Sequence, residues 1–355
     1  MLKNITIKGK EIQFPVFFPD ATKGVIRACD SNDLRSVNIE GIIVNTYHLL
    51  KNPGLKVLNS VGGLKPFTNW DGIVISDSGG FQLLSMISKD SKLGEITENG
   101  ILFKDSDKEI LFTPEKCIQT QFAINSDIMI CLDYCPPEKP SKEDIQSSVE
   151  ITVRWAKRCK DEYDRIVKEK GLEDTNRPLL FGVIQGGDSK DMRYKCAQEL
   201  IAMNFDGYGF GGWPLDKNGK LNDDILEYTC SLMPNDKPKY ALGVGSYEGI
   251  LKGTIWGYDI FDAILPTRDA RNGRIYNLNI DRGAFEYTYI EDEKNLYIND
   301  PLDIKCDCYT CQNYTKSFLN YLFKNNERLA SRFATIHNLR TYTRLIDILK
   351  TQRNG

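Results

Sequence analysis

Short apolar segments recur along the chain, and small or polar residues follow each of them. Most of these segments lack the strict alternation of apolar and polar positions that marks a strand with one wet face. Continuous apolar runs of this length are typical of parallel strands that are buried on both faces. Eight strands are predicted in this way, at residues 14–18, 41–45, 72–76, 128–132, 179–184, 208–212, 240–244 and 260–265.

Helical patterns separate several of these predicted strands. Ser141 precedes a long helical pattern at residues 142–170, and Asp144 stands three positions further on, which is the spacing of a capping box. Another helix is predicted to begin at Thr113, because Pro114 then takes the first helical position. The third and fourth strands are too far apart for one helix, and residues 94–112 between them predict an inserted β-hairpin.

The order of these elements predicts an α/β fold. Eight strand–helix units over about 250 residues favour a (β/α)8 TIM barrel over an open doubly wound sheet. The absence of a glycine-rich nucleotide motif after the first strand points the same way. We expect a catalytic barrel domain at residues 1–300 and a zinc-binding subdomain at residues 301–355, with a basic helical tail packed on the barrel.

Composition and charge limit which ligands and which cellular compartment we expect for the protein. The net charge of −3 excludes a uniformly polybasic nucleic-acid binder, but residues 312–355 carry eight basic and two acidic side chains. This asymmetry indicates either a polyanion site or a solvated helical face. No apolar stretch is long enough for a membrane helix, and most of the ten cysteines stand singly in apolar runs, so we expect a reduced, cytoplasmic protein without membrane contact.

One cysteine cluster differs from the other cysteines. Cys306, Cys308 and Cys311 stand close together, and 25 residues separate Cys311 from His337, one of only two histidines. Three thiolates and one imidazole make a closed tetrahedral ligand set, which is typical of structural rather than catalytic zinc. A helix-like segment at residues 314–335 would separate the ligands. Free thiols beside a core histidine are the alternative.

Polar residues stand at the predicted carboxyl ends of the strands, where barrels of this type hold their active sites. They include Asp77, Asp133, Gln185 and Asp262, and the last interrupts an apolar run. Any one of these acids can be explained as a helix cap, but that explanation is poor for all of them together. Two carboxylates on opposing strands suit a reaction at the anomeric carbon of a sugar, one as nucleophile and one as general acid and base. Asp133 and Gln185 suit the polar edge of a purine, with Phe81 stacked on its face.

Several longer motifs carry a family resemblance over nearly the whole chain. They read NTYHLLKNPG (45–54), SDSGGFQLLSM (76–86), VIQGG (183–187), FDGYGFGG (205–212), ALGVG (241–245), FDAILPTRDARNG (261–273) and CDCYTC with TIHNLR. These motifs resemble the tRNA-guanine transglycosylase family of queuine and archaeosine tRNA-ribosyltransferases. The resemblance implies a TIM barrel with a zinc subdomain that exchanges guanine at the wobble position of tRNA for a 7-deazaguanine base in the queuosine pathway. It also implies a homodimer and no energy cofactor.

The resemblance assigns roles to individual residues. Asp262 matches the nucleophile that forms a covalent ribosyl-enzyme intermediate, and Asp77 matches the general acid and base. The matched substrate-binding residues are Ser78, Gly79, Gly80, Phe81, Asp133, Gln185 and Gly212. The matched RNA-binding residues are Gly243, Gly245, Ser246, Tyr247, Thr267, Arg268, Asp269, Ala270 and Arg271. The zinc ligands are Cys306, Cys308, Cys311 and His337.

Some positions depart from the family pattern and leave alternatives open. Lys217 follows Asp216 where bacterial members carry a glutamate for a cationic aminomethyl group. Lys217 cannot accept that group, whereas Asp216 could if the loop shifts, so the inserted base could instead be a nitrile-bearing or a larger queuine-type one. His48 is as consistent with a core or supporting histidine as with a catalytic one. Base exchange in DNA is an alternative to exchange in tRNA. A non-catalytic RNA-binding partner subunit is a further alternative, although such subunits are expected to lose the two catalytic acids.

Overall fold

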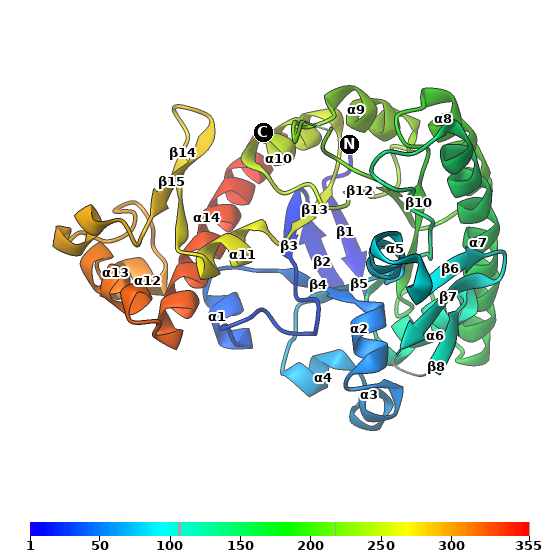
Figure 1. The fold of residues 1–355 in the computed structure, drawn as a ribbon, viewed down its shortest axis with the longest axis horizontal. Helices are drawn as coiled ribbons and strands as arrows, with labels where there is room; N and C mark the ends of the chain where they lie inside the picture. Colours follow the sequence, from blue (N-terminus) through cyan, green and yellow to red (C-terminus); the bar gives the residue numbers. More distant parts are fainter. Residues whose placement is uncertain (106–107, 217, 355) are drawn as a thin grey trace.

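The computed structural model describes residues 1–105, 108–216 and 218–354 and has a barrel of eight parallel strands at its centre (Figure 1). The sheet runs in the order β3-β13-β12-β11-β10-β9-β5-β4. A bridge between Asp20 and Ile43 joins β3 to β4, so the two ends of the sheet meet. The strands are β3 (Val16–Pro19), β4 (Gly41–Asn45), β5 (Ile73–Asp77), β9 (Ile128–Ile130), β10 (Leu179–Ile184), β11 (Gly207–Phe210), β12 (Lys239–Ala241) and β13 (Ile260–Ala263). All eight predicted strands and the predicted TIM-barrel class are confirmed.

Helices surround the barrel (Figure 1). They are α1 (Ser31–Ser36), α2 (Thr46–Lys51), α3 (Leu55–Val61), α4 (Leu64–Thr68), α5 (Gly80–Lys89), α6 (Pro114–Ile124), α7 (Lys142–Glu169), α8 (Lys190–Ala202), α9 (Asp223–Leu232), α10 (Tyr247–Trp256) and α11 (Leu265–Arg271). Two predicted helix starts are confirmed. The Thr113 side chain caps α6 with Pro114 as the first helical residue, and Ser141 and Asp144 form the capping box of α7.

An N-terminal hairpin covers the end of the barrel where the strands begin. Its strands, β1 (Asn4–Ile7) and β2 (Lys10–Gln13), pair antiparallel. Ile7 and Ile12 are buried in the same apolar cluster as the barrel strands. Lys8 donates to the carbonyl of Ser126 at 2.9 Å, and Lys10 donates to the carbonyl of Asp71 at 3.3 Å, just before β9 and β5. With this end covered, a ligand has to enter from the opposite end, where the strands terminate.

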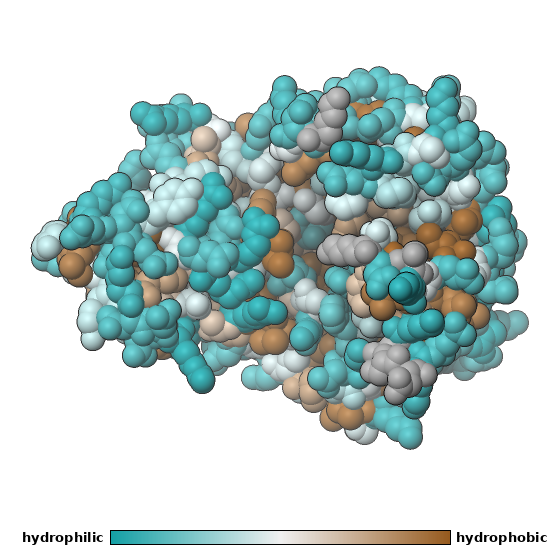
Figure 2. All heavy atoms as spheres, viewed as in Figure 1, coloured by the Kyte–Doolittle hydropathy of each residue, from teal (hydrophilic) through white to brown (hydrophobic). Residues whose placement is uncertain are grey.

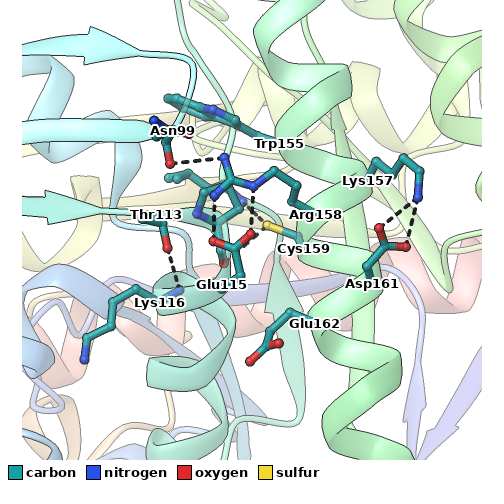
Figure 3. Close-up of polar contacts among 12 residues, drawn as sticks. Asn99, Thr113, Glu115, Lys116, Trp155, Lys157, Arg158, Cys159, Asp161 and Glu162 are labelled. Atoms are coloured by element: carbon teal, nitrogen blue, oxygen red, sulfur yellow. Dashed lines mark hydrogen bonds and ion pairs between the residues drawn. The ribbon is translucent and has the colours of Figure 1, made fainter.

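The insertion after β5 is antiparallel, as predicted, and has three strands where a two-stranded hairpin was expected. They are β6 (Gly94–Thr97), β7 (Gly100–Asp105) and β8 (Lys108–Phe112), after a short 3-10 helix η1 (Ser91–Leu93). Figure 3 shows how α7 holds this sheet against α6. Arg158 donates to both carboxylate oxygens of Glu115 at 2.7 Å and to the carbonyl of Asn99 at 3.1 Å. Trp155 donates to the carbonyl of Glu98 at 3.1 Å.

The C-terminal elements lie beside the barrel, with α12 and α13 at the left of Figure 1 and α14 between them and the barrel. They are β14 (Arg274–Asn279), β15 (Ala284–Tyr289), η2 (Glu293–Tyr297), α12 (Tyr309–Asn313), α13 (Lys316–Lys324) and α14 (Arg328–Asn354). The segment 314–335, predicted as one helix, is two helices, because α13 stops at Lys324 and Asn326 adopts a positive φ of 55°. α14 contacts α12 and α13 near its start and β3 of the barrel further along. The predicted domain boundary at residue 300 stays a prediction.

The basic residues of the tail serve mainly to anchor α14. Five of the eight basic residues form ion pairs within the chain: Arg332 with Asp33, Arg340 with Asp307, Arg344 with Asp303, Lys350 with Glu40 and Arg353 with Asp259. The sequence suggested a polyanion site or a solvated helical face for these residues and did not predict the ion pairs. The side chains of Arg353 and Asp259 are 4% and 2% exposed, so this pair is buried. Such pairs fix the register of a helix against its neighbours, because a charge left unpaired in the interior is costly.

The distribution of hydrophilic and apolar residues on the surface agrees with a barrel whose apolar side chains are buried in its core. On the face shown in Figure 2, hydrophilic residues cover most of the periphery and apolar residues gather toward the middle. Among the described helices, none combines the length and apolarity that crossing a membrane requires.

Candidate active site

The strand order brings the predicted polar residues onto one rim of the barrel. Asp262, Asp77, Asp133 and Gln185 stand at or just after the ends of β13, β5, β9 and β10. Parallel strands in a closed barrel all end on the same side, so these side chains surround one mouth. Burial raises the pKa of the Tyr240 hydroxyl, and the charges of Asp262 and Asp77 add to that shift.

Asp77 is held by its neighbours on β4 and by the turn that follows it. Asn45 donates from Nδ2 to Oδ2 at 3.0 Å, and the Gly79 amide donates to Oδ1 at 2.9 Å. Burial raises the pKa of Asp77 to about 7, although these hydrogen bonds oppose the shift. A carboxyl with this pKa can give and take a proton near neutral pH, which is what a general acid and base must do.

Asp262 is held on the opposite side of the mouth. The Tyr240 hydroxyl and the Gly243 amide each donate to Oδ1 at 2.8 Å, whereas no described residue donates to the second carboxylate oxygen, which is available to a ligand. Burial raises the pKa of Asp262 to about 6, and the two hydrogen bonds oppose that shift. The group is therefore ionised at neutral pH and oriented by a phenol and a backbone amide, as a carboxylate nucleophile requires.

A fourth carboxylate on this rim, Asp20, was missed by sequence reasoning. It follows β3, whose neighbours are β13 and β4, so it lies on the rim between Asp262 and Asn45. The Thr22 hydroxyl lies 2.8 Å from Oδ1 and 2.7 Å from Oδ2. Its charge contributes to raising the pKa of both Asp77 and Asp262. The sequence signal was an acid after an apolar strand, but β3 has no family motif and Asp20 stood outside every segment singled out.

Asp133, Gln185 and Ser78 form a connected polar pocket beside Asp77. Gln185 donates from Nε2 to Asp133 Oδ2 at 2.7 Å, and Ser78 donates to Oδ1 at 3.3 Å. Gln185 is fully buried, and its Oε1 has no hydrogen-bond partner among the described residues. A buried amide oxygen without a partner costs free energy, so this atom is suited to accept an N–H group from a ligand.

Small residues and two aromatic side chains complete this pocket. Gly79 has φ +76°, and a Cβ there would come within 2.8 Å of the Tyr47 amide, so the turn from Asp77 into α5 requires glycine. Phe81 is 48% exposed and lies edge-on to Trp213 with ring centroids 5.3 Å apart. Trp213, which sequence reasoning did not assign to the site, directly follows Gly212 and is fixed by a hydrogen bond to the Pro136 carbonyl at 3.1 Å.

The residues matched to RNA binding fall into two groups. The first group lies where β12 leads into α10. There the Gly243 amide donates to Asp262, and Gly245, Ser246 and Tyr247 follow, with Ser246 as the N-cap of α10. In α11, the side chains of Thr267, Asp269 and Ala270 are buried. Asp269 accepts a hydrogen bond from Tyr276 at 2.6 Å and pairs with Arg268 and Arg274. Among the matched residues of this helix, Arg268 is exposed and Arg271 is half-buried, and RNA binding by the set stays a prediction.

The four predicted metal ligands come together. One ligand atom each from Cys306, Cys308, Cys311 and His337 lies within 4.8 Å of the others. His337 points Nδ1 at the sulfurs, 3.2 Å from Cys311 Sγ, and its Nε2 lies 2.7 Å from the Tyr276 carbonyl. That carbonyl fixes the ring so that Nδ1 is the free ligand atom, as is common for metal-binding histidines. This buried Cys3His set fits zinc, which would tie α12 to α14 and supply no catalytic chemistry.

Three further positions that the sequence singled out are Asp216, Lys217 and His48. Lys217 lies outside the described residues. The Asp216 carboxylate accepts backbone hydrogen bonds from Asn218 at 2.8 Å and Lys220 at 2.9 Å, so it serves a turn. His48 lies in α2, and burial lowers its pKa, while the charge of Asp20 opposes that change. The supporting and the catalytic role of His48 both stay predictions.

The similarity to known queuine tRNA-ribosyltransferases extends over nearly the whole chain. The family model described as "Queuine tRNA-ribosyltransferase" matches residues 2–352. The chain is 40% identical over 342 residues to the queuine tRNA-ribosyltransferase of Caldanaerobacter subterraneus subsp. tengcongensis, covering 96% of this chain and 86% of the relative. It is 38% identical over 341 residues to the one of Staphylococcus epidermidis, covering 95% and 84%. It is 37% identical over 342 residues to the one of Psychrobacter cryohalolentis, covering 96% and 86%.

Proposed function

Because the chain belongs to the queuine tRNA-ribosyltransferase family, a family of glycosyltransferase enzymes, we propose that it exchanges guanine at the wobble position of tRNA for a 7-deazaguanine base. The observation that carries the proposal is the pairing of two partly buried carboxyls of raised pKa with the polar pocket of Asp133 and Gln185 on the same rim. One glycosidic bond replaces another, so the reaction needs no energy cofactor.

Asp262 is the proposed nucleophile and Asp77 the proposed general acid and base. The free carboxylate oxygen of Asp262 attacks C1′ of the ribose while the bond from C1′ to guanine breaks, and Asp77 gives its proton to the departing base. The incoming 7-deazaguanine returns a proton to Asp77 and attacks C1′, and the ester to Asp262 breaks. Retention at C1′ follows from the two displacements. Tyr240 and the Gly243 amide hold the nucleophile in place between the steps.

The pocket around Asp133 is the proposed binding site of the base. Gln185 Oε1 and the Asp133 carboxylate are acceptors for the N–H groups on the edge of a guanine-like ring. The Gly212 amide, which makes no hydrogen bond to a described residue, is the proposed donor to the ring carbonyl. Phe81 and Trp213 lie together next to these groups and offer aromatic faces for stacking.

The proposal is tested by incubating an anticodon hairpin with labelled guanine and the zinc-loaded enzyme. We expect label in the RNA, and we expect Asp262→Asn to abolish trapping of a covalent RNA adduct while RNA binding persists. Binding without exchange by the unaltered enzyme would contradict the proposal and favour a non-catalytic partner subunit. A DNA hairpin of the same sequence, run in parallel, separates tRNA from DNA as the acceptor.

We also propose that the enzyme acts as a homodimer through an aromatic surface of the zinc-binding part. Tyr309, Tyr314, Phe318 and Tyr321 form a continuous row, with neighbouring ring centroids 5.9, 5.4 and 6.5 Å apart. Tyr309, Phe318 and Tyr321 remain 45%, 38% and 54% exposed. A contiguous row of exposed aromatic rings is typical of a protein interface, and the family relationship supports a second copy as the partner.

A further inference from the structure

Arg193 is a buried cation beside the proposed base pocket, and neither the sequence motifs nor the proposed mechanism gives it a role. It lies in the first turn of α8 and is 1% exposed. Burial lowers the pKa of Arg193 to about 10, so the guanidinium stays charged at neutral pH. None of the described carboxylates forms an ion pair with it. An unpaired buried charge costs free energy, so its retention calls for an explanation.

The guanidinium instead donates to three backbone carbonyls at the ends of β10 and β11. Nε donates to Gly187 at 2.7 Å, Nη1 to Ile184 at 3.2 Å and Nη2 to Gly211 at 3.1 Å. Its carbon lies 4.4 Å from the centre of the Phe210 ring, so the group is stacked as well as hydrogen-bonded. One planar side chain thus ties together the loops that carry Gln185 and Gly212.

The backbone is shaped to let Arg193 reach these carbonyls. Gly186 has φ +145°, and a Cβ there would come within 2.6 Å of the Arg193 amide. A side chain at Gly186 would therefore displace the start of α8. On the side of β11, a Cβ at Gly212 would lie 3.5 Å from Arg193 Nη2 and 3.6 Å from Gln185 Oε1. The Gly212 backbone is therefore close to both of these side chains.

The contact with Gly211 decides the direction of the next amide. The Gly211 carbonyl and the Gly212 N–H belong to one peptide unit, and in a trans peptide these two groups point in opposite directions. Because Arg193 holds the carbonyl on its own side, the Gly212 N–H must point away from Arg193. The same contact polarises the peptide unit and strengthens that N–H as a donor.

We propose that Arg193 is a positioning residue that directs the Gly212 N–H at the ring carbonyl of the bound base and so makes the pocket selective for 6-oxopurines. This inference rests on the proposed function, because it takes the pocket to be the base site. Arg193 does not touch the base; it acts through the Gly211–Gly212 peptide. A 6-oxo base accepts the hydrogen bond from Gly212, whereas a base without that oxygen leaves the amide unpaired.

The experiment compares the equilibrium binding of guanine and 2-aminopurine, which lacks the 6-oxo group, to the free enzyme. The fluorescence of 2-aminopurine gives its affinity directly, and guanine is measured by competition. We expect Arg193→Met to reduce the preference for guanine about tenfold, the effect of one lost hydrogen bond, and Arg193→Lys to retain part of it. The lysine variant keeps the buried charge, so it also serves if the methionine variant does not fold.

Arg177→Met is the matched control. Arg177 pairs with Asp206 at 2.7 and 2.8 Å at the opposite ends of the same two strands, so its loss weakens the fold without reaching the Gly211–Gly212 peptide. We expect this control to keep the full preference for guanine. Equal losses for both bases in the Arg193 variants would show a merely structural role and overturn the inference. An unaltered enzyme that binds neither base would overturn the proposed function as well.

Discussion

At the scale of single residues, the same carboxylate chemistry is tuned differently by each environment. Burial raises the pKa of Asp77 to about 7 and that of Asp262 to about 6. Asp262 accepts hydrogen bonds from a phenol and an amide, whereas Asp77 accepts them from an asparagine and an amide. One acid is thus ionised and the other partly protonated at the same neutral pH, which allows them to divide the roles of nucleophile and acid.

The first prediction concerns the pH dependence of kcat/KM for RNA, which reports the free enzyme. Asp262 must be ionised, so the rate should fall as pH drops below about 6. Asp77 must carry a proton to release guanine, so the rate should also fall as pH rises above about 7. Initial rates with labelled guanine in buffers of constant ionic strength measure this profile. A rate that keeps rising to high pH would exclude Asp77 as the acid.

The second prediction concerns Asp20, whose charge contributes to the raised pKa of both proposed catalytic acids, Asp77 and Asp262. Asp20→Asn removes that charge at nearly constant volume, so both pKa values should fall. We expect both limbs of the pH profile to move to lower pH by a few tenths of a unit, as for loss of a nearby like charge. Asp71→Asn is the control, because Asp71 lies at the opposite end of the barrel on Arg35. An unchanged profile for Asp20→Asn would place its charge outside the reacting site.

At the scale of elements, α14 joins the two parts of the chain. Its first half carries the metal ligand His337, and its second half carries Arg353, which pairs with Asp259 just before β13. The Tyr342 hydroxyl donates to the Gly245 carbonyl at 2.6 Å, which fixes the loop next to Gly243 and hence the nucleophile. The helix therefore supports the active site through the barrel, independently of the metal.

The third prediction follows from these two attachments. Removing zinc with a chelator should expose the amides of α12 and of the first turns of α14 to hydrogen exchange, because the metal supplies the folding free energy of that segment. The barrel strands should keep their protection, since ion pairs to Asp259 and Glu40 hold the end of α14. Cys306→Ala should reproduce the effect, and Cys230→Ala, outside the cluster, should not. Simultaneous loss of protection in the barrel would contradict this division.

At the scale of the whole molecule, the proposed active site lies on one rim of the barrel and the aromatic row lies on the C-terminal part (Figure 1). α14 separates the two, so a partner that covers the aromatic row need not cover the barrel mouth. In a dimer, the exposed Arg268 and the mouth of one copy would remain open to RNA.

The fourth prediction concerns this assembly. Phe318→Asp or Tyr321→Asp places a charge within the aromatic row and should convert a dimer to a monomer, which light scattering after gel filtration measures directly. Tyr194→Asp is the control, because Tyr194 is a similarly exposed aromatic residue, 52% accessible, on α8. A protein that is monomeric without any substitution, at concentrations well above those in the assay, would remove the dimer from the proposal.

The sequence by itself determined the local features of this protein. Apolar runs predicted each barrel strand, capping residues predicted where α6 and α7 begin, and the spacing of Cys306, Cys308 and Cys311 predicted the metal site, because neighbours in sequence decide these properties. The tertiary structure alone decided which side chains meet across the barrel. Closure of β3 onto β4 and β13 put Asp20 between Asp77 and Asp262, the two proposed catalytic acids, and the fold of α8 under β10 and β11 put Arg193 beside the proposed base pocket. It also turned the basic tail into the ion pairs of α14. Such contacts join residues up to hundreds of positions apart in the sequence. Local sequence patterns do not predict them, because these residues become neighbours only when the barrel closes.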